Sequence, residues 1–427
     1  MVLAALLAGG VAACGGAGRP HASPKATVGL TVREAPHPPV PPAGAPALKA
    51  QLSSLLAQAG PASGASVYDL SDNLSLFAMR QGIARPPASV EKLYTSLAVL
   101  RELGPDATLQ TKVLGAGSLG SRGVWHGDLY LVGGGDPTFG EQAFNRTWEF
   151  GYGPTAAQLS DQLRADGIRR VTGHLIGDGS LFDGRAGPPS TGFAPDVPDL
   201  GGQLSALTFD HGSTAGLRPA AFAARQVART MSDMQIQANP APVPGKAPNG
   251  AKVLATVSSP PMSIVLRLTD LQSDDLFAEM LTKQLGARFA GSGTTAAGAS
   301  VTSQVIASYG IHPQIVDGSG LSRADRSSPL QMVQLLRLLD GTDAGRELQA
   351  TLPAVGVDGT AKTIATNTAA QGRCIAKTGT LAGVTNLAGY CHSRSGRRLA
   401  FVLFVDGPSN QSALQLESKM ISAIARL

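Results

Sequence analysis

The chain has 427 residues, which is enough for two domains, and its 43% of hydrophobic residues is enough for a large core. Charged residues make up only 15%, and the net charge of +5 is dispersed, with no basic stripe between aromatic residues. This composition lacks the electrostatic pattern of a nucleic-acid-binding protein, so we expect no nucleic-acid partner. The 52 glycines and 29 prolines predict many turns.

The N-terminal part of the chain resembles an export signal. Residues 2–13 are a short apolar run, typical of the hydrophobic part of a secretory signal and too short to span a bilayer. The three residues before Cys14 resemble a bacterial lipobox, so Cys14 is a possible lipid anchor; the alternative is an ordinary cleavage region with an incidental cysteine. We predict a signal or lipobox-like segment over 1–14, a Pro/Ala-rich tether over 15–47 and a location in the extracytoplasmic envelope.

The segment 48–107 mixes helical and strand patterns. The spacing of its apolar residues predicts a helix, two strands and a second helix, at 48–59, 64–70, 74–78 and 89–103. The two strands are joined by the polar residues Ser71-Asp72-Asn73, and Asn and Asp favour the positive φ that such turns use. Gly104-Pro105 ends the second helix.

Residues 108–255 differ in character and predict an inserted α/β module. Its expected strands lie at 109–114, 128–132, 171–176 and 204–210, its helices at 155–166 and 219–231, and a Pro/Ala linker at 239–249. A glycine-rich stretch at 133–137 lacks the G-K-[ST] ending of a phosphate-binding loop, so we predict a turn there. The chain has no H-E-x-x-H motif and no Cys/His cluster of zinc spacing, so we expect neither a metal nor another cofactor.

Residues 256–427 return to helical signals and end with three strands. An apolar run at 262–271 leads to Ser273-Asp274-Asp275. Helices are expected at 276–285, 301–309, 330–339 and 412–427, and strands at 373–377, 384–391 and 398–406. Cys374 and Cys391 lie in two of these strands, which allows either a cross-strand disulfide or two buried free thiols.

A serine and a lysine stand three residues apart at the start of the predicted helix after Pro87. Ser89 and Lys92 therefore lie one turn apart on one face, where the hydroxyl becomes a nucleophile if the amine loses its proton. Alone, this pattern is more typical of a capping serine and a surface lysine. However, Ser89 and Lys92 form the only S-x-x-K of the chain, and a single K-T-G follows downstream at Lys377-Thr378-Gly379.

With these motifs the chain resembles the D-alanyl-D-alanine carboxypeptidase/endopeptidase family, the class C low-molecular-mass penicillin-binding proteins. The matching stretches span about 85–381 in the order of that family: 87–92, 131–137, 273–279, 317–322 and 377–381. The resemblance implies an α+β fold, with an antiparallel sheet between helices (48–107 plus 256–427) and an inserted module (108–255). It also implies peptidoglycan stem peptides as substrates and β-lactams as covalent inhibitors.

The resemblance also implies a role for each site residue. Ser89 is the nucleophile, Lys92 accepts its proton, Ser273 relays a proton to the leaving nitrogen and Asp275 orients Lys92. Lys377, Thr378 and Thr380 hold the terminal carboxylate of the substrate, and the backbone N–H groups of Ser89 and Thr380 form the oxyanion hole. Gly379 leaves room for a peptide against the sheet edge. Asp317-Gly318 is expected to be an ordinary turn outside the site.

One position departs from the pattern of the family. The second motif is usually S-x-N, whereas this chain has Ser273-Asp274-Asp275. The literal S-D-N at 71–73 precedes the nucleophile and is interpreted as a structural turn. Asp275 can accept hydrogen bonds but cannot donate as an amide does, and it favours a protonated Lys92. Activity is therefore expected to be lowered or shifted in pH. The alternatives are a non-catalytic cell-wall-binding relative, a β-lactamase or esterase of the same fold, or a protein whose insertion chiefly binds a partner.

Overall fold

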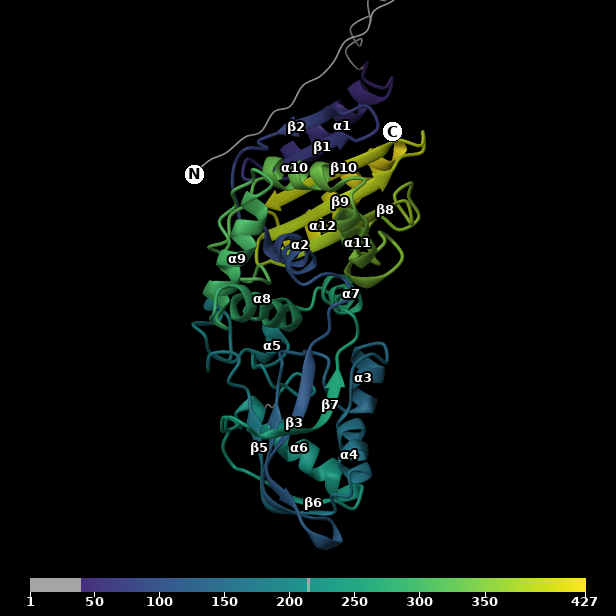
Figure 1. Ribbon diagram of the computed structural model, residues 1–427. Helices are drawn as coiled ribbons and strands as arrows, with labels where there is room; N and C mark the ends of the chain where they lie inside the picture. The colour runs from purple at the N-terminus through teal and green to yellow at the C-terminus, as the bar shows by residue number, and fades with distance from the viewer. Residues whose placement is uncertain (1–39, 213–215) are drawn as a thin grey trace, which may run out of the picture. The chain divides into compact units, whose positions relative to one another are not determined.

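The computed structural model describes residues 40–212 and 216–427 (Figure 1). The predicted segment 1–14, with Cys14, and most of the predicted tether 15–47 lie outside these residues. Within the two described ranges, no helix combines the length and apolar character that a membrane crossing requires. The described residues belong to one compact unit with two five-stranded sheets.

The first sheet has the strand order β2-β1-β10-β9-β8 and is antiparallel throughout. Its strands are β1 (Gly64–Asp69), β2 (Leu74–Met79), β8 (Cys374–Leu381), β9 (Val384–His392) and β10 (Arg398–Asp406). The turn between β1 and β2 holds Ser71-Asp72-Asn73, where Asn73 has a φ of 55° and accepts a hydrogen bond from the Tyr68 hydroxyl at 2.6 Å. This confirms that the S-D-N copy at 71–73 is a structural turn.

Helices cover both faces of the first sheet. On one face, α1 (Ala45–Gln58) and α12 (Asn410–Arg426) form one hydrophobic core with the sheet. The other face packs against a larger set of helices. These are α2 (Lys92–Glu102), α7 (Met262–Gln272), α8 (Asp275–Phe289), α9 (Thr295–Ala307), α10 (Pro329–Leu339) and α11 (Asp343–Thr351). The α+β class with an antiparallel sheet between helices is thus confirmed.

The second sheet is mixed and has the order β6-β5-β4-β3-β7. Its strands are β3 (Gln110–Leu119), β4 (Val124–Val132), β5 (Arg170–Asp178), β6 (Gln237–Pro240) and β7 (Lys252–Ser258). The pairs β4–β5 and β5–β6 are parallel, and the pairs of β3 are antiparallel. Its helices are α3 (Gln142–Trp148), α4 (Ala156–Ala165), α5 (Val197–Leu200) and α6 (Pro219–Asp233). Side chains of α4 and α6 share a separate core with this sheet.

Two predictions in this region are wrong. Residues 204–210 form no strand, because their alternating apolar side chains serve two cores: Leu204 and Ala206 pack in one, and Leu207 and Phe209 in another. The alternation therefore does not reflect a sheet. The predicted linker at 239–249 begins inside strand β6, and β7 follows it without having been predicted.

Cys374 and Cys391 lie directly opposite each other on β8 and β9 and form a disulfide that encloses a sequence separation of 17 residues. Of the two alternatives, the structure therefore has the cross-strand bridge. We expect the double variant Cys374→Ala/Cys391→Ala to lose about 3 kcal/mol of unfolding free energy, because the unfolded chain is no longer constrained. Urea denaturation measures this loss. Reductant should destabilise the wild type by a similar amount and leave the variant unchanged; equal stability of all samples would contradict the prediction.

Candidate active site

The Ser89 segment is a tight turn rather than the first turn of an α-helix. Residues Ala88–Glu91 form a 3-10 turn, and α2 begins at Lys92. Ala88 is buried with a φ of 50°, a conformation that costs energy for a residue with a side chain. Gly320 makes room for it, since a Cβ on that glycine would lie 2.0 Å from the Ala88 carbonyl oxygen. Close packing against Gly320 thus holds the turn in this conformation.

Lys92 is completely buried, and its amine contacts the hydroxyl of Ser89. Its Nζ donates to Ser89 Oγ at 3.1 Å and to the Ser319 carbonyl oxygen at 2.8 Å, and it forms an ion pair with Asp275 Oδ1. Three acceptors match the three N–H groups of an ammonium. Burial raises the pKa of Asp275, while the charge of Lys92 acts in the opposite direction. The departure from S-x-N therefore places a carboxylate directly on the amine of the S-x-x-K motif.

The second motif lies between two helices. Ser273 caps the C-terminus of α7 with a φ of 59°, and Asp274 caps the N-terminus of α8 by accepting from the Phe277 N–H at 2.9 Å. The left-handed conformation of Ser273 is again costly for a residue with a side chain. Its hydroxyl accepts from Lys377 Nζ at 2.8 Å. The second and third motifs are therefore joined directly.

Lys377 on β8 is also fully buried. Burial, followed by repulsion from Lys92, lowers the pKa of Lys377 to about 7. Among the three residues predicted to bind substrate, Thr380 is exposed, while the Thr378 hydroxyl donates to the Thr360 hydroxyl at 2.7 Å. Thr360, which no motif indicated, thus orients Thr378.

The role of Gly379 differs from the expectation. A Cβ at this position would lie 2.8 Å from the Pro87 carbonyl oxygen and 3.0 Å from the Ser89 nitrogen. The glycine therefore allows β8 to pack against the turn of the nucleophile, rather than only leaving space for a peptide. Asn386 on β9 fastens the same turn, since its amide donates to the carbonyl oxygens of Pro86 and Pro87 at 3.0 Å each.

The segment 317–322 belongs to the site, although the sequence analysis left it out as an ordinary turn. Its Ser319 carbonyl is a partner of Lys92, as described above. Buried Glu279 on α8 holds this loop, because its Oε1 accepts from the N–H groups of Gly318 and Ser319, both at 2.9 Å, and from the Ser319 hydroxyl at 2.7 Å. Asp317 accepts from the N–H groups of Gly320 and Ser322, both at 2.8 Å. The sequence signal for this role was the match of 317–322 to the pattern of the family, which was interpreted above as an ordinary turn.

Four buried carboxyl groups stand around the same loop and Lys92. They belong to Glu91, Glu279, Asp317 and Asp325. Burial raises the pKa of each, that of Glu279 to about 8 and that of Asp325 to about 11. Both oxygens of Glu91 lack a partner among the described residues, in keeping with a neutral acid. In contrast to these four groups, Asp275 forms an ion pair with Lys92.

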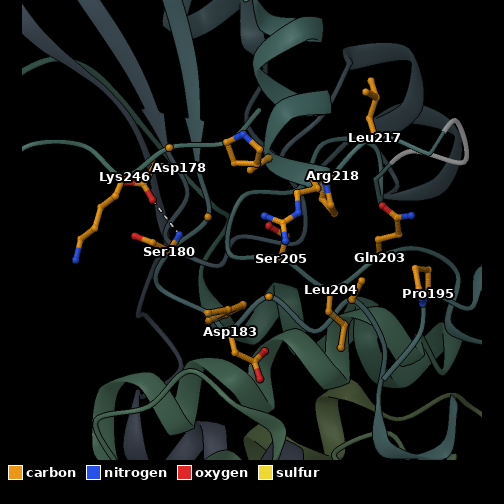
Figure 2. Close-up of a pocket in the computed structure, with 18 of the residues that line it drawn as sticks. Asp178, Ser180, Asp183, Pro195, Gln203, Leu204, Ser205, Leu217, Arg218 and Lys246 are labelled. Atoms are coloured by element: carbon orange, nitrogen blue, oxygen red, sulfur yellow. Dashed lines mark hydrogen bonds between the residues drawn. The ribbon is translucent and has the colours of Figure 1, made fainter. Parts of the chain in front are cut away.

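A separate cavity of about 510 Å³ lies in the second-sheet region near the start of α6 (Figure 2). Asp178, Ser205 and Arg218 are among the residues that line it. The Asp178 carboxylate is occupied by the backbone N–H groups of Ser180 and Ala247, at 2.9 and 2.8 Å. None of the eight predicted site residues lines this cavity, so the predicted site lies outside it.

A family profile described as "D-Ala-D-Ala carboxypeptidase 3 (S13) family" matches residues 48–215 and 212–427. The chain belongs to this family. This membership confirms the resemblance and the enzyme class, a serine-type carboxypeptidase.

Individual relatives agree with the family assignment. The chain is 27% identical to the D-alanyl-D-alanine carboxypeptidase of Actinomadura sp. (strain R39), over 86% of this chain and 81% of that protein. It is 30% identical to carboxypeptidase Rv3627c of Mycobacterium tuberculosis, over 77% and 73%. The crystal structure of penicillin binding protein 4 (dacB) from Haemophilus influenzae matches with a TM-score of 0.72 and 20% identity, over 88% of this chain and 99% of that one. This last likeness concerns the fold.

Variants of Lys92 and Asp275 should shift the pKa of Lys377 in opposite directions, which tests the arrangement of the site. We expect Lys92→Met to raise the pKa of Lys377, because a neighbouring positive charge disfavours the charged amine and the variant removes it. Asp275→Asn should lower the pKa of Lys377, because the carboxylate favours the charged amine. Heteronuclear NMR of the lysine side chains measures both shifts. Shifts of the same sign, or none, would contradict the arrangement described here.

Proposed function

We propose that this protein is a D-Ala-D-Ala carboxypeptidase/endopeptidase that cleaves peptidoglycan stem peptides through an acyl-enzyme on Ser89. The contact of 3.1 Å between Lys92 Nζ and Ser89 Oγ carries the proposal, because it pairs a nucleophile with the group that can take its proton. The ion pair with Asp275 and the bond between Lys377 and Ser273 complete the cluster.

In the proposed reaction, the ammonium of Lys92 first gives one proton to solvent, and Ser89 Oγ then attacks the carbonyl carbon before the terminal D-alanine while its own proton passes to the neutral amine of Lys92. As the peptide bond breaks, Ser273 donates its hydroxyl proton to the leaving nitrogen and regains a proton from Lys92. The backbone N–H groups of Ser89 and Thr380 stabilise the oxyanion, where one lost donor typically costs about 10²–10³ in rate. Lys377, Thr378 and Thr380 bind the terminal carboxylate, and water then releases the acyl group.

We also propose the wider setting that the resemblance implied. The protein acts in the extracytoplasmic envelope, with a lipid anchor on Cys14 as one possible attachment, and β-lactams acylate it. Residues 48–107 plus 256–427 form the catalytic domain, and residues 108–255 form the inserted module. Export, lipidation and these boundaries are independent of the reaction itself.

Labelling with fluorescent penicillin tests the proposed nucleophile. We expect a covalent adduct with the wild type and none with Ser89→Ala, because the acyl group has no other attachment point. Ser273→Ala should acylate about 10²–10⁴-fold more slowly, since a positioned proton relay is lost. The matched control is Ser71→Ala in the structural S-D-N turn, which should label like the wild type. A wild type that is never labelled would favour a non-catalytic wall-binding protein, and rapid loss of the adduct would favour a β-lactamase.

The rate of acylation tests the role of Asp275. We expect Asp275→Asn to raise the rate at pH 7 about tenfold, the effect of roughly 1.4 kcal/mol on the barrier, because Lys92 must give up its ion pair with Asp275 before it can take the proton of Ser89 and the variant lacks that ion pair. Asp274→Asn keeps the helix cap and is the control. An unchanged or lower rate in Asp275→Asn would refute this role.

Glu279→Gln tests the support of the Ser319 carbonyl. The amide has one acceptor and two donors in a place where Glu279 Oε1 accepts from three donors, so we expect the loop to shift and acylation to slow about tenfold. Glu417→Gln on α12 is the control, because Glu417 is an equally buried carboxyl group outside the site. Equal acylation rates in the two variants would show that Glu279 serves stability alone.

A further inference from the structure

Three exposed aromatic side chains lie within five residues, at the end of α3 and in the turn that follows it. Trp148, Phe150 and Tyr152 are 58%, 64% and 43% exposed, and we call them the aromatic surface. In the described part of the chain, only one other large aromatic residue, Phe289, is comparably exposed. Since buried packing is the usual place for such side chains, this concentration within five residues indicates a binding surface.

The aromatic surface is held rigidly. Glu149, between Trp148 and Phe150, is buried and bonded to His211 at 2.9 Å. The N–H of Tyr152 donates to the Glu149 carbonyl at 2.9 Å. Phe150 has a φ of 54°, which is unusual for a residue with a large side chain. A strained, well-bonded turn that exposes three rings loses little freedom when a ligand binds.

The same segment adjoins the second catalytic motif. The side-chain amide of Gln272 donates to the Trp148 carbonyl at 2.9 Å, and Gln272 immediately precedes Ser273. His211, the partner of Glu149, also packs edge to face against Phe277 of α8, with ring centres 5.5 Å apart. The segment that carries the aromatic surface is therefore bonded directly to the residue before Ser273 and packed against α8.

Polar groups adjoin the rings. Tyr152 lines an open cavity of about 700 Å³ together with Gln158, Asp161 and Ser258. The side chains of Gln158, Asp161 and Ser258 are exposed, so their amide, carboxylate and hydroxyl groups are accessible to a ligand. A pyranose ring offers C–H groups on its faces and hydroxyl or acetamido groups at its edge, so it can use rings and polar groups together. This combination of rings and polar groups is less suited to a membrane surface, because clusters of basic residues usually bind such surfaces.

We propose that the aromatic surface binds the amino-sugar strand of peptidoglycan and thereby presents the attached stem peptide to the active site. This rests on the proposed function, because the stem peptide is joined to that strand. Each ring packs against one sugar face, and the cavity beside Tyr152 receives the polar substituents of a neighbouring sugar. The surface thus selects stem peptides that are still attached to glycan over free peptides.

Tryptophan fluorescence provides a direct test, because the chain has only two tryptophans and the other, Trp125, is buried. Soluble glycan strands, freed of stem peptides by an amidase, should shift the emission of the wild type and leave Trp148→Phe unshifted. Calorimetry with the same strands should show at least about tenfold weaker binding by Trp148→Ala/Phe150→Asn/Tyr152→Ala, since the covered ring area is lost. Asn suits the positive φ of position 150, so it removes the ring without adding strain. Phe289→Ala is the matched control and should bind like the wild type.

Kinetics complete the test. For stem peptides attached to glycan, the triple variant should have a KM about tenfold higher, and for free stem peptides its KM and kcat should stay within about twofold of the wild type. Unchanged glycan binding by the triple variant, an equal loss in Phe289→Ala, or a fluorescence shift with anionic lipid vesicles but not with glycan would overturn the proposal. If the wild type cleaves neither free nor glycan-attached stem peptides, the proposed function fails, while glycan binding still decides this inference.

Discussion

The site depends on the burial of one ammonium group. Moving a lysine charge out of water costs several kcal/mol unless its N–H groups find partners and its charge is matched. Lys92 meets both conditions with Ser89, the Ser319 carbonyl and Asp275. These partners come from the turn before α2, the loop at 317–322 and the first residue of α8. The contacts of the buried Lys92 amine therefore hold together three segments that are far apart in the sequence.

The neighbouring backbone is shaped to serve that amine. Ala88 and Ser273 both have positive φ values, and each stands at or beside a residue of the catalytic motifs. Such strain persists only where the surroundings over-determine it. Around Ala88 the surroundings are Gly320 and Gly379, whose missing side chains allow close packing, and Asn386, whose amide fastens the turn from β9. The glycines of the motifs are thus explained by contact between protein segments.

Much of the fold and part of the site could be predicted from the sequence, because both have local or strongly periodic signals. The strands of the first sheet, most of its covering helices and the proximity of Ser89 to Lys92 follow from spacing alone, whereas α11 was not predicted. The Ser319 carbonyl could not be predicted in the same way, since every residue has a carbonyl and only the tertiary fold selects one. Thr360 and Asn386 act through one or two long-range hydrogen bonds that leave no pattern in the sequence. The false strand at 204–210 shows the opposite case, in which a clear pattern arises from packing between two cores.

The Asp275 carboxylate acts differently on the two amines of the site, those of Lys92 and Lys377. It contacts Lys92 directly, whereas it acts on Lys377 only through space, and the nearest contacts of Lys377 are the Ser273 hydroxyl and its own strand. Burial and the charge of Lys92 lower the pKa of Lys377 to about 7, so this amine is close to equal protonation at neutral pH. Lys377, next to Ser273, can therefore gain or lose a proton at little cost in free energy. An asparagine in place of Asp275 would hold Lys92 by a hydrogen bond without a full charge and would reduce this difference. The residue at position 275 thus decides whether Lys92 faces a full negative charge, and it acts on the pKa of Lys377 through space.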